Sequence, residues 1–75
     1  MPFVEIKMIE GELSKEEIKK LVEDVTNAVV SNVGENLRSV IWVTVQEIKS
    51  DYFGVGGQCI GLKEIRAMQA GSTEE

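Results

Sequence analysis

The sequence predicts a small α/β (α+β) protein: a β-α-β unit with parallel strands, followed by a short C-terminal hairpin, and assembled as an oligomer. Three observations lead to this expectation. Residues 3–9 alternate between apolar and polar side chains, residues 14–33 repeat apolar side chains at helical spacing, and residues 39–48 alternate again. A strand, a long helix and a strand in succession form a crossover unit, so the two strands should be parallel with a right-handed connection.

The first strand is predicted over residues 3–9, with Val4, Ile6 and Met8 on one face. Ser14 follows shortly afterwards, and Glu17 stands three residues further on. This pair is a capping box, which is typical of a helix start.

The helix is predicted over residues 14–33, and Gly34 supplies its C-terminal stop. Apolar side chains recur along it at helical spacing, namely Ile18, Leu21, Val22, Val25, Ala28, Val29 and Val33. Charged side chains fall largely on the opposite face, so the helix should be amphipathic and should cover one side of the sheet.

The second strand is predicted over residues 39–48, with Ile41, Val43 and Val45 on one face. One helix can cover only one face of the sheet. The other face would carry apolar side chains beside polar ones: Phe3, Ile9, Val40 and Trp42 with Glu5, Lys7, Thr44 and Gln46. In a monomer that face would be exposed, which favours contacts between subunits.

Residues 53–57, Phe-Gly-Val-Gly-Gly, predict a glycine-rich turn or short hairpin. A phosphate-binding loop is excluded because no Lys-Ser/Thr pair follows. A short helix is expected around Leu62–Met68, and residues 71–75 are expected to be disordered. We treat residues 1–75 as a single domain whose residues 58–75 form a C-terminal tail.

Composition excludes several classes of protein. Cys59 is the only cysteine and there is no histidine, so neither a disulfide nor a histidine-ligated metal site is expected. The net charge of -5 gives no basic patch for nucleic acid. No apolar run is long enough for a membrane span, and a free thiol without a signal peptide indicates the cytoplasm. A chain of 75 residues buries little surface alone, so we expect a multimer.

Three motifs in this short chain belong together. The chain opens Met-Pro-Phe-Val-Glu-Ile, Ile9-Glu10-Gly11 precedes the capped helix, and Phe53–Gly57 follows the second strand. In combination they resemble the 4-oxalocrotonate tautomerase (2-hydroxymuconate tautomerase) family over roughly residues 2–58. The resemblance implies a tautomerase-like fold and a hexamer whose active sites use more than one subunit.

The resemblance also implies that Pro2 is catalytic. Removal of Met1 would leave a secondary amine, and the pKa of a model α-amino group, about 7.7–8.0, falls on desolvation or near cations. Such an amine can act as a general base. Without the resemblance, a proline that simply begins a strand would be the simpler interpretation.

The implied reaction moves a proton on an unsaturated 2-hydroxy or 2-oxo acid such as 2-hydroxymuconate, a small-molecule substrate, and it needs no cofactor and no metal. Phe53 matches the family's apolar active-site phenylalanine. A plug in a subunit interface is an equally good interpretation of Phe53, and the two roles are compatible.

The family's two substrate-binding arginines are replaced. One position holds Glu12 and the other holds Ile41 or Trp42, depending on the gap placement. Arg38, just ahead of the second strand, is the candidate substitute, although an exposed arginine without a role fits as well. Lys49 is a weaker candidate.

Three hypotheses follow from this departure. The protein is an active tautomerase with altered substrate preference, or a weakly catalytic subunit of a hetero-hexamer whose related chain supplies the arginines, or a homo-oligomer that binds rather than turns over its ligand. Pro2 and Phe53 favour the first hypothesis, whereas Glu12 favours the other two.

Overall fold

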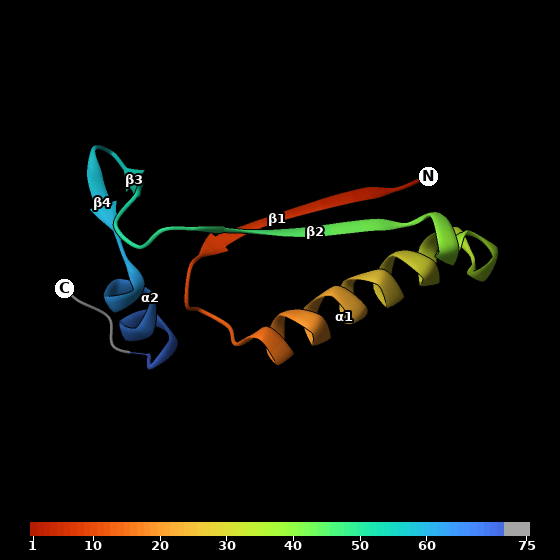
Figure 1. The fold of residues 1–75 in the computed structure, drawn as a ribbon, viewed down its shortest axis with the longest axis horizontal. Coiled ribbons are helices and arrows are strands. Elements are labelled where there is room, and N and C mark those ends of the chain that lie inside the picture. The colour runs from red at the N-terminus through yellow and green to blue at the C-terminus, as the bar shows by residue number, and fades with distance from the viewer. Residues whose placement is uncertain (72–75) are drawn as a thin grey trace. The chain divides into compact units, whose positions relative to one another are not determined.

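The computed structural model describes residues 1–71, and its elements follow the expected order (Figure 1). They are β1 (Phe3–Ile9), α1 (Lys15–Val33), the 3-10 helix η1 (Glu35–Val40), β2 (Trp42–Ile48), β3 (Phe53–Val55), β4 (Gln58–Ile60) and α2 (Leu62–Gln69). The chain divides into two compact units. The first comprises residues 1–6 and 13–46, and the second comprises residues 7–12 and 47 onward.

The sheet of β1 and β2 is parallel, as predicted. Near the starts of both strands, the Trp42 N–H donates to the Pro2 carbonyl at 3.0 Å. At their ends, the Glu10 N–H donates to the Ile48 carbonyl at 2.7 Å. Parallel neighbours need a long crossover, and α1 provides it, running back beside the strands (Figure 1).

The predicted helix over residues 14–33 is confirmed as α1 with Ser14 as its N-cap. Ser14 Oγ accepts the Glu17 N–H at 3.1 Å, and a Glu17 carboxylate oxygen accepts the Ser14 N–H at 2.8 Å. At the other end Gly34 adopts φ 108° and donates its N–H to Val30 at 2.8 Å. Both caps satisfy backbone groups that the helix itself leaves unpaired.

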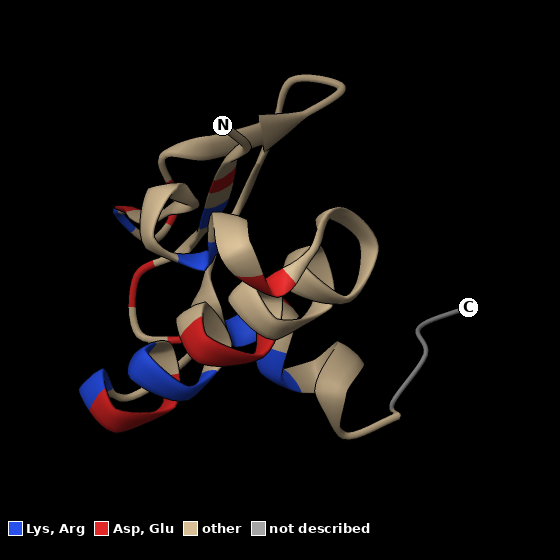
Figure 2. Cartoon of the chain, turned by 90° about the vertical axis from the view of Figure 1, so that its right-hand side faces the viewer, with Lys and Arg blue, Asp and Glu red and all other residues tan. Residues whose placement is uncertain are grey.

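In the first unit the apolar stripe of α1 is half-buried and Val30 is buried. Basic and acidic bands alternate over the first turns of α1 (Figure 2). Val4 and Val43 are half-buried, whereas Phe3 and Trp42 are 61% and 54% exposed. The predicted division of the sheet into a covered and an open face is therefore confirmed at these positions.

The predicted start of the second strand at residue 39 is wrong, because residues 35–40 form η1 and β2 begins at Trp42. Gly34 reverses the chain at the end of α1, and the short connection closes in i→i+3 turns. The Leu37 N–H bonds Gly34, and the Ile41 N–H bonds Arg38, both at 3.2 Å. Val40 at the end of η1 and Ile41 after it are both apolar, so the sequence alone does not distinguish them from the first residues of a strand.

In the second unit the glycine-rich segment is the turn of a hairpin. β3 and β4 pair antiparallel, with Phe53 opposite Ile60. Gly56 and Gly57 have φ values of 59° and 86°, as a two-residue hairpin turn requires. The predicted hairpin is confirmed.

The expected C-terminal helix is α2, one residue longer than predicted. The Gly61 N–H donates to Glu64 at 2.9 Å, and the Leu62 N–H donates to Ser50 Oγ at 2.8 Å. Gly61 is buried, and a Cβ there would lie 2.7 Å from Ser50 Oγ. Of the segment predicted to be disordered, Gly71 follows α2, and residues 72–75 lie outside the described residues.

Ile9 was expected on the open face of the sheet, but it is buried, with 4% of its surface exposed. It stands where β1 ends and the chain turns. Its N–H donates to the Glu12 carboxylate at 3.2 Å and its carbonyl accepts the Glu12 N–H at 3.1 Å. Ile9 belongs to the second unit, where it lies beside Ile48, Phe53 and Ile65, so strand alternation no longer decides its exposure.

Candidate active site

Pro2 lies at the start of β1 in an apolar pocket of the first unit. The pocket measures about 250 Å³ and is lined by Met1, Pro2, Phe3 and Trp42. The Phe3 and Trp42 rings are tilted by 46° with centroids 5.9 Å apart. Because the Trp42 N–H holds the Pro2 carbonyl, the proline ring keeps a fixed place beside the two aromatic rings.

Phe53 lies in β3 and lines a pocket of about 190 Å³ within the second unit. We call this the Phe53 pocket. Its walls are mostly apolar: Met8, Ile9, Ile48, Phe53 and Ile65. Lys7 and Glu12 also line it, so a cation and a carboxylate stand at one small apolar site. Such a combination suits a small organic acid with an apolar body.

Glu12, which the resemblance predicts to replace a family arginine, is folded back into its own loop. Its carboxylate accepts the Ile9 N–H at 3.2 Å, so one oxygen is held toward the end of β1. A carboxylate at this place repels a second carboxylate on a ligand.

Arg38 belongs to the first unit, but it is not among the residues that line the pocket of Pro2. Its Nε donates to Glu35 at 2.7 Å, and a second nitrogen lies 3.4 Å from the other Glu35 oxygen. The hydrogen bond from Arg38 lowers the pKa of the exposed Glu35 carboxyl. Both partners of this ion pair belong to η1. Arg38, which the sequence suggested as a substrate ligand, is thus paired with Glu35.

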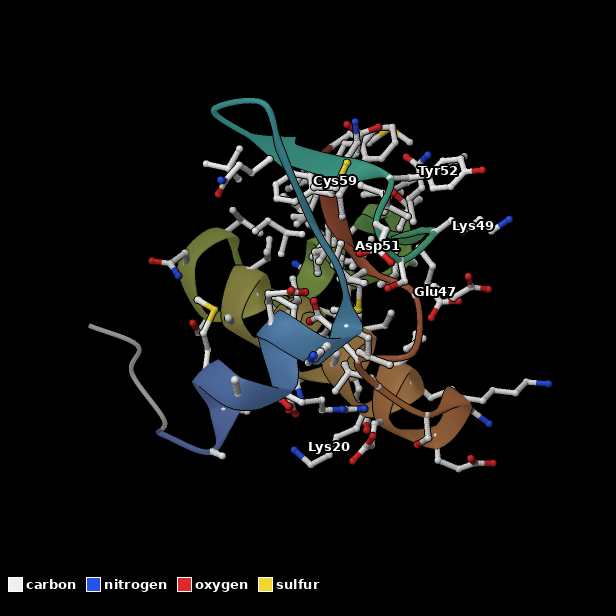
Figure 3. All side chains as sticks on the ribbon, turned by 90° about the vertical axis from the view of Figure 1, so that its left-hand side faces the viewer. Lys20, Glu47, Lys49, Asp51, Tyr52 and Cys59 are labelled. Carbon is white, nitrogen blue, oxygen red and sulfur yellow. The ribbon has the colours of Figure 1, made fainter. Side chains whose placement is uncertain are left out.

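Lys49 lies in the second unit, with its Nζ 5.1 Å from the centre of the Tyr52 ring. Figure 3 shows both side chains reaching outward on the same side. Neither residue lines the Phe53 pocket. Cys59, on β4, is an exposed free thiol.

Sequence reasoning missed the grouping of Lys7, Ile65 and Arg66 around the Glu12 loop. Lys7 was recognised only as a polar residue of the open face. Arg66 donates to the carbonyls of Gly11 and Glu12 at 2.7 and 3.2 Å. These contacts join residues that are 54 and 55 positions apart in the sequence. No local sequence pattern predicts contacts at such a separation.

Three further findings concern residues 1–71. No three histidine, cysteine, aspartate or glutamate side chains of this stretch lie close enough together to hold a metal ion. None of its helices is both long and apolar enough to cross a membrane. An open hollow of about 610 Å³ lies along α1 between Glu16 and Glu23, and none of the predicted site residues lines it.

A parallel β-α-β unit with a proline directly before its first strand is the arrangement that the family resemblance implies. The chain belongs to the tautomerase family, because the model of that family, described as "Tautomerase enzyme", matches residues 2–63. It is a tautomerase of the 4-oxalocrotonate tautomerase type.

Individual relatives agree with this assignment. A probable tautomerase of Staphylococcus saprophyticus is 42% identical over 57 residues, which cover 76% of this chain and 90% of the relative. The crystal structure of YwhB, a homologue of 4-oxalocrotonate tautomerase, is 36% identical with a TM-score of 0.69, and the match covers 77% of this chain and 92% of YwhB. A heterohexamer 4-oxalocrotonate tautomerase from Chloroflexus aurantiacus is 26% identical with a TM-score of 0.67, covering 88% of this chain and all of that one.

Proposed function

We propose that this tautomerase moves a proton on an unsaturated 2-hydroxy or 2-oxo acid, with Pro2 as the general base and without a cofactor. The observation that carries the proposal is the apolar surface of Phe3 and Trp42 beside Pro2, in a pocket that Met1 also lines and would leave when it is removed. An amine in apolar surroundings loses the hydration that favours its charged form, so its pKa falls and it is neutral near pH 7. Proline also has a locked ring, which leaves little entropy to lose when its lone pair meets a substrate.

The proton balance of the reaction is simple. The neutral Pro2 nitrogen takes the proton of the enol hydroxyl while the O–H electrons form the ketone C=O. The C=C electrons shift away from the enol carbon, and the carbon at which they arrive takes the proton back from the prolinium: the adjacent carbon in phenylenolpyruvate, or a more distant one in a conjugated dienol. The base ends as it began, so no other reactant is needed.

Within one chain Pro2 and the Phe53 pocket belong to different units, so we assign the binding of the substrate's carboxylate to the Phe53 pocket of a neighbouring subunit in the proposed oligomer, where Lys7 supplies the cation. Glu12 in the same pocket disfavours a second carboxylate. The preferred substrate should therefore be a monocarboxylate with an apolar body, such as phenylenolpyruvate, rather than the dicarboxylate 2-hydroxymuconate.

Assembly is part of the proposal. A chain of this size with exposed Phe3 and Trp42 should associate, and a hexamer is the state we propose. Oligomerisation would also allow side chains of different subunits to meet at one site.

The test compares two forms of the same chain. Protein freed of Met1, verified by intact mass, should ketonise phenylenolpyruvate, and protein that keeps Met1 should not, because the Pro2 nitrogen is then an amide. Pro2→Ala leaves a primary amine and should retain part of the activity. Equal rates with and without Met1 would rule out catalysis by Pro2.

A second function has a specific observation in its favour. Neither Glu12 nor the Ile41–Trp42 segment provides the arginines of the family, and a structural neighbour of this chain is a heterohexamer. The chain would then be a weakly catalytic subunit that pairs with an arginine-bearing relative. Inactive Met1-free protein that gains activity when a related chain is co-expressed would establish this alternative.

A further inference from the structure

The second half of α2 lies beyond the part of the chain that the family model matches, which ends at residue 63. Arg66 stands in this half. One of its terminal nitrogens donates to the Gly11 carbonyl at 2.7 Å. The other donates to the Glu12 carbonyl at 3.2 Å and to Gln69 at 2.8 Å. A segment outside the family match thus holds the loop that carries Glu12.

The Glu12 loop, residues 10–12, is held from the strand side as well. The Glu10 N–H bonds the Ile48 carbonyl at 2.7 Å, and the Glu12 N–H bonds the Ile9 carbonyl at 3.1 Å. Gly11 has φ 94°, and a Cβ at Gly11 would lie 3.0 Å from a methyl carbon of Leu62 on α2. The loop is therefore confined between the end of β1 and α2.

α2 also contributes an apolar side chain to the pocket in which Glu12 lies. Ile65, next to Arg66 in sequence, lines the Phe53 pocket together with Glu12. Arg66 itself is exposed and does not line the pocket. Its effect on a ligand there would therefore pass through the backbone of the Glu12 loop.

We propose that Arg66 is a positioning residue that holds the Glu12 carboxylate at the Phe53 pocket and thereby makes the pocket select monocarboxylates over dicarboxylates. The proposal rests on the proposed function only in taking the Phe53 pocket as the acid-binding site. Without the hydrogen bonds from Arg66 to the Gly11 and Glu12 carbonyls, the Glu12 loop becomes more mobile. The Glu12 carboxylate then turns to solvent, and its repulsion of a second carboxylate on the ligand weakens.

The positioning role of Arg66 is tested by measuring ligand binding rather than turnover, so the result does not depend on catalysis by Pro2. Hexanoate and adipate have the same chain length and differ by one carboxylate. Chemical-shift titration of the full chain should show hexanoate binding more tightly. In Arg66→Met, which keeps the unbranched stem, the ratio of the two dissociation constants should fall by about three- to tenfold, the range for loss of one ordinary hydrogen bond, because Arg66 acts on the ligand only through the loop. Arg66→Lys should restore part of the preference.

Lys63→Met is the matched control, since Lys63 is exposed on the same helix and its replacement removes the same charge. It should leave the ratio unchanged. Amide exchange adds a second readout: the Ile9 and Glu12 N–H groups should exchange faster in Arg66→Met, while those in the middle of α1 should not change.

An unchanged ratio in Arg66→Met, an equal shift in Lys63→Met, or binding of neither acid would overturn the positioning role. A wild-type chain that binds the acids selectively but shows no Pro2-dependent turnover would overturn the proposed function instead, and leave the role of Arg66 standing.

Discussion

The rings of Phe3 and Trp42 lie 5.9 Å apart across the start of the parallel sheet, and both side chains are more than half exposed. An aromatic pair is normally among the first groups that a fold buries. Here it borders the proline that we propose as the base. The pair therefore links two properties, the apolar surroundings of Pro2 and the surface through which subunits would meet.

The first prediction concerns this surface. Phe3→Ala should raise the dissociation constant of the oligomer by more than tenfold, because burying a phenylalanine contributes about 1.5–3 kcal/mol at each contact. Analytical ultracentrifugation measures the change, with Lys19→Ala on the exposed face of α1 as the control. A wild-type chain that stays a folded monomer at micromolar concentration would contradict the prediction.

The second prediction concerns the cap of α1. Ser14→Ala removes the oxygen that accepts the Glu17 N–H and should lower the free energy of unfolding by about 1 kcal/mol. Ser31→Ala is the matched control, since Ser31 is exposed within the same helix and its hydroxyl makes only local bonds, donating to the Ala28 carbonyl at 2.7 Å and accepting from Asn32 at 3.4 Å, so it should change little. Denaturant titrations at equal protein concentration compare the two. Equal stability of both variants would mean that the cap contributes nothing.

The third prediction concerns charge at the Phe53 pocket. Glu12→Arg should raise kcat/KM for 2-hydroxymuconate about tenfold, if the new cation makes one charge-assisted hydrogen bond worth about 1.5 kcal/mol. Glu12→Gln removes the negative charge but keeps an oxygen for the Ile9 N–H, so it should give a smaller gain. Steady-state kinetics of Met1-free protein decide the point. No gain from either substitution would show that Glu12 does not face the substrate.

The fourth prediction follows from Glu64. The Gly61 N–H donates to its carboxylate, and this hydrogen bond lowers the pKa of Glu64 below the ordinary value of 4.5. A carboxyl with a lowered folded-state pKa stabilises the fold above its unfolded pKa and loses that effect as pH falls through the folded value. Amide protection at the start of α2 should thus decline below about pH 4.5.

The control for this prediction is Glu64→Gln, whose amide oxygen can accept the same N–H but does not titrate. In that variant the acid-dependent loss of protection in the first turn of α2 should disappear. Identical pH profiles for the variant and the wild type would assign the loss to other carboxyl groups.

The sequence predicted the elements that local rules control. The alternation of apolar and polar side chains predicted the strand Phe3–Ile9. The capping box predicted the start of α1, and the glycine pair predicted the hairpin turn. It failed at residues 39–41, because Gly34 sends the chain into a 3-10 turn that apolar periodicity does not reveal. It also failed at Ile9, whose burial depends on residues far along the chain.

The candidate site was predictable only in part. Pro2 and Phe53 came from a resemblance, and the structure places an apolar pocket at each. The surroundings of Glu12 could not be predicted, because Arg66 bonds the Glu12 loop from 54 and 55 positions further along the sequence. Arg38 was a plausible ligand from its position, yet its pairing with Glu35 depends on the 3-10 geometry that the sequence did not indicate.

Gly61 joins the hairpin to α2 in an ordinary extended conformation, with φ -127°, so its backbone would suit any residue. What a larger residue would meet there is the side chains of Asp51 and Ser50, which would have to move aside. Ser50 Oγ accepts the Leu62 N–H at 2.8 Å, so its displacement would remove a hydrogen bond at the first residue of α2. The absence of a side chain at Gly61 therefore lets the loop before the hairpin act as a cap for the helix after it.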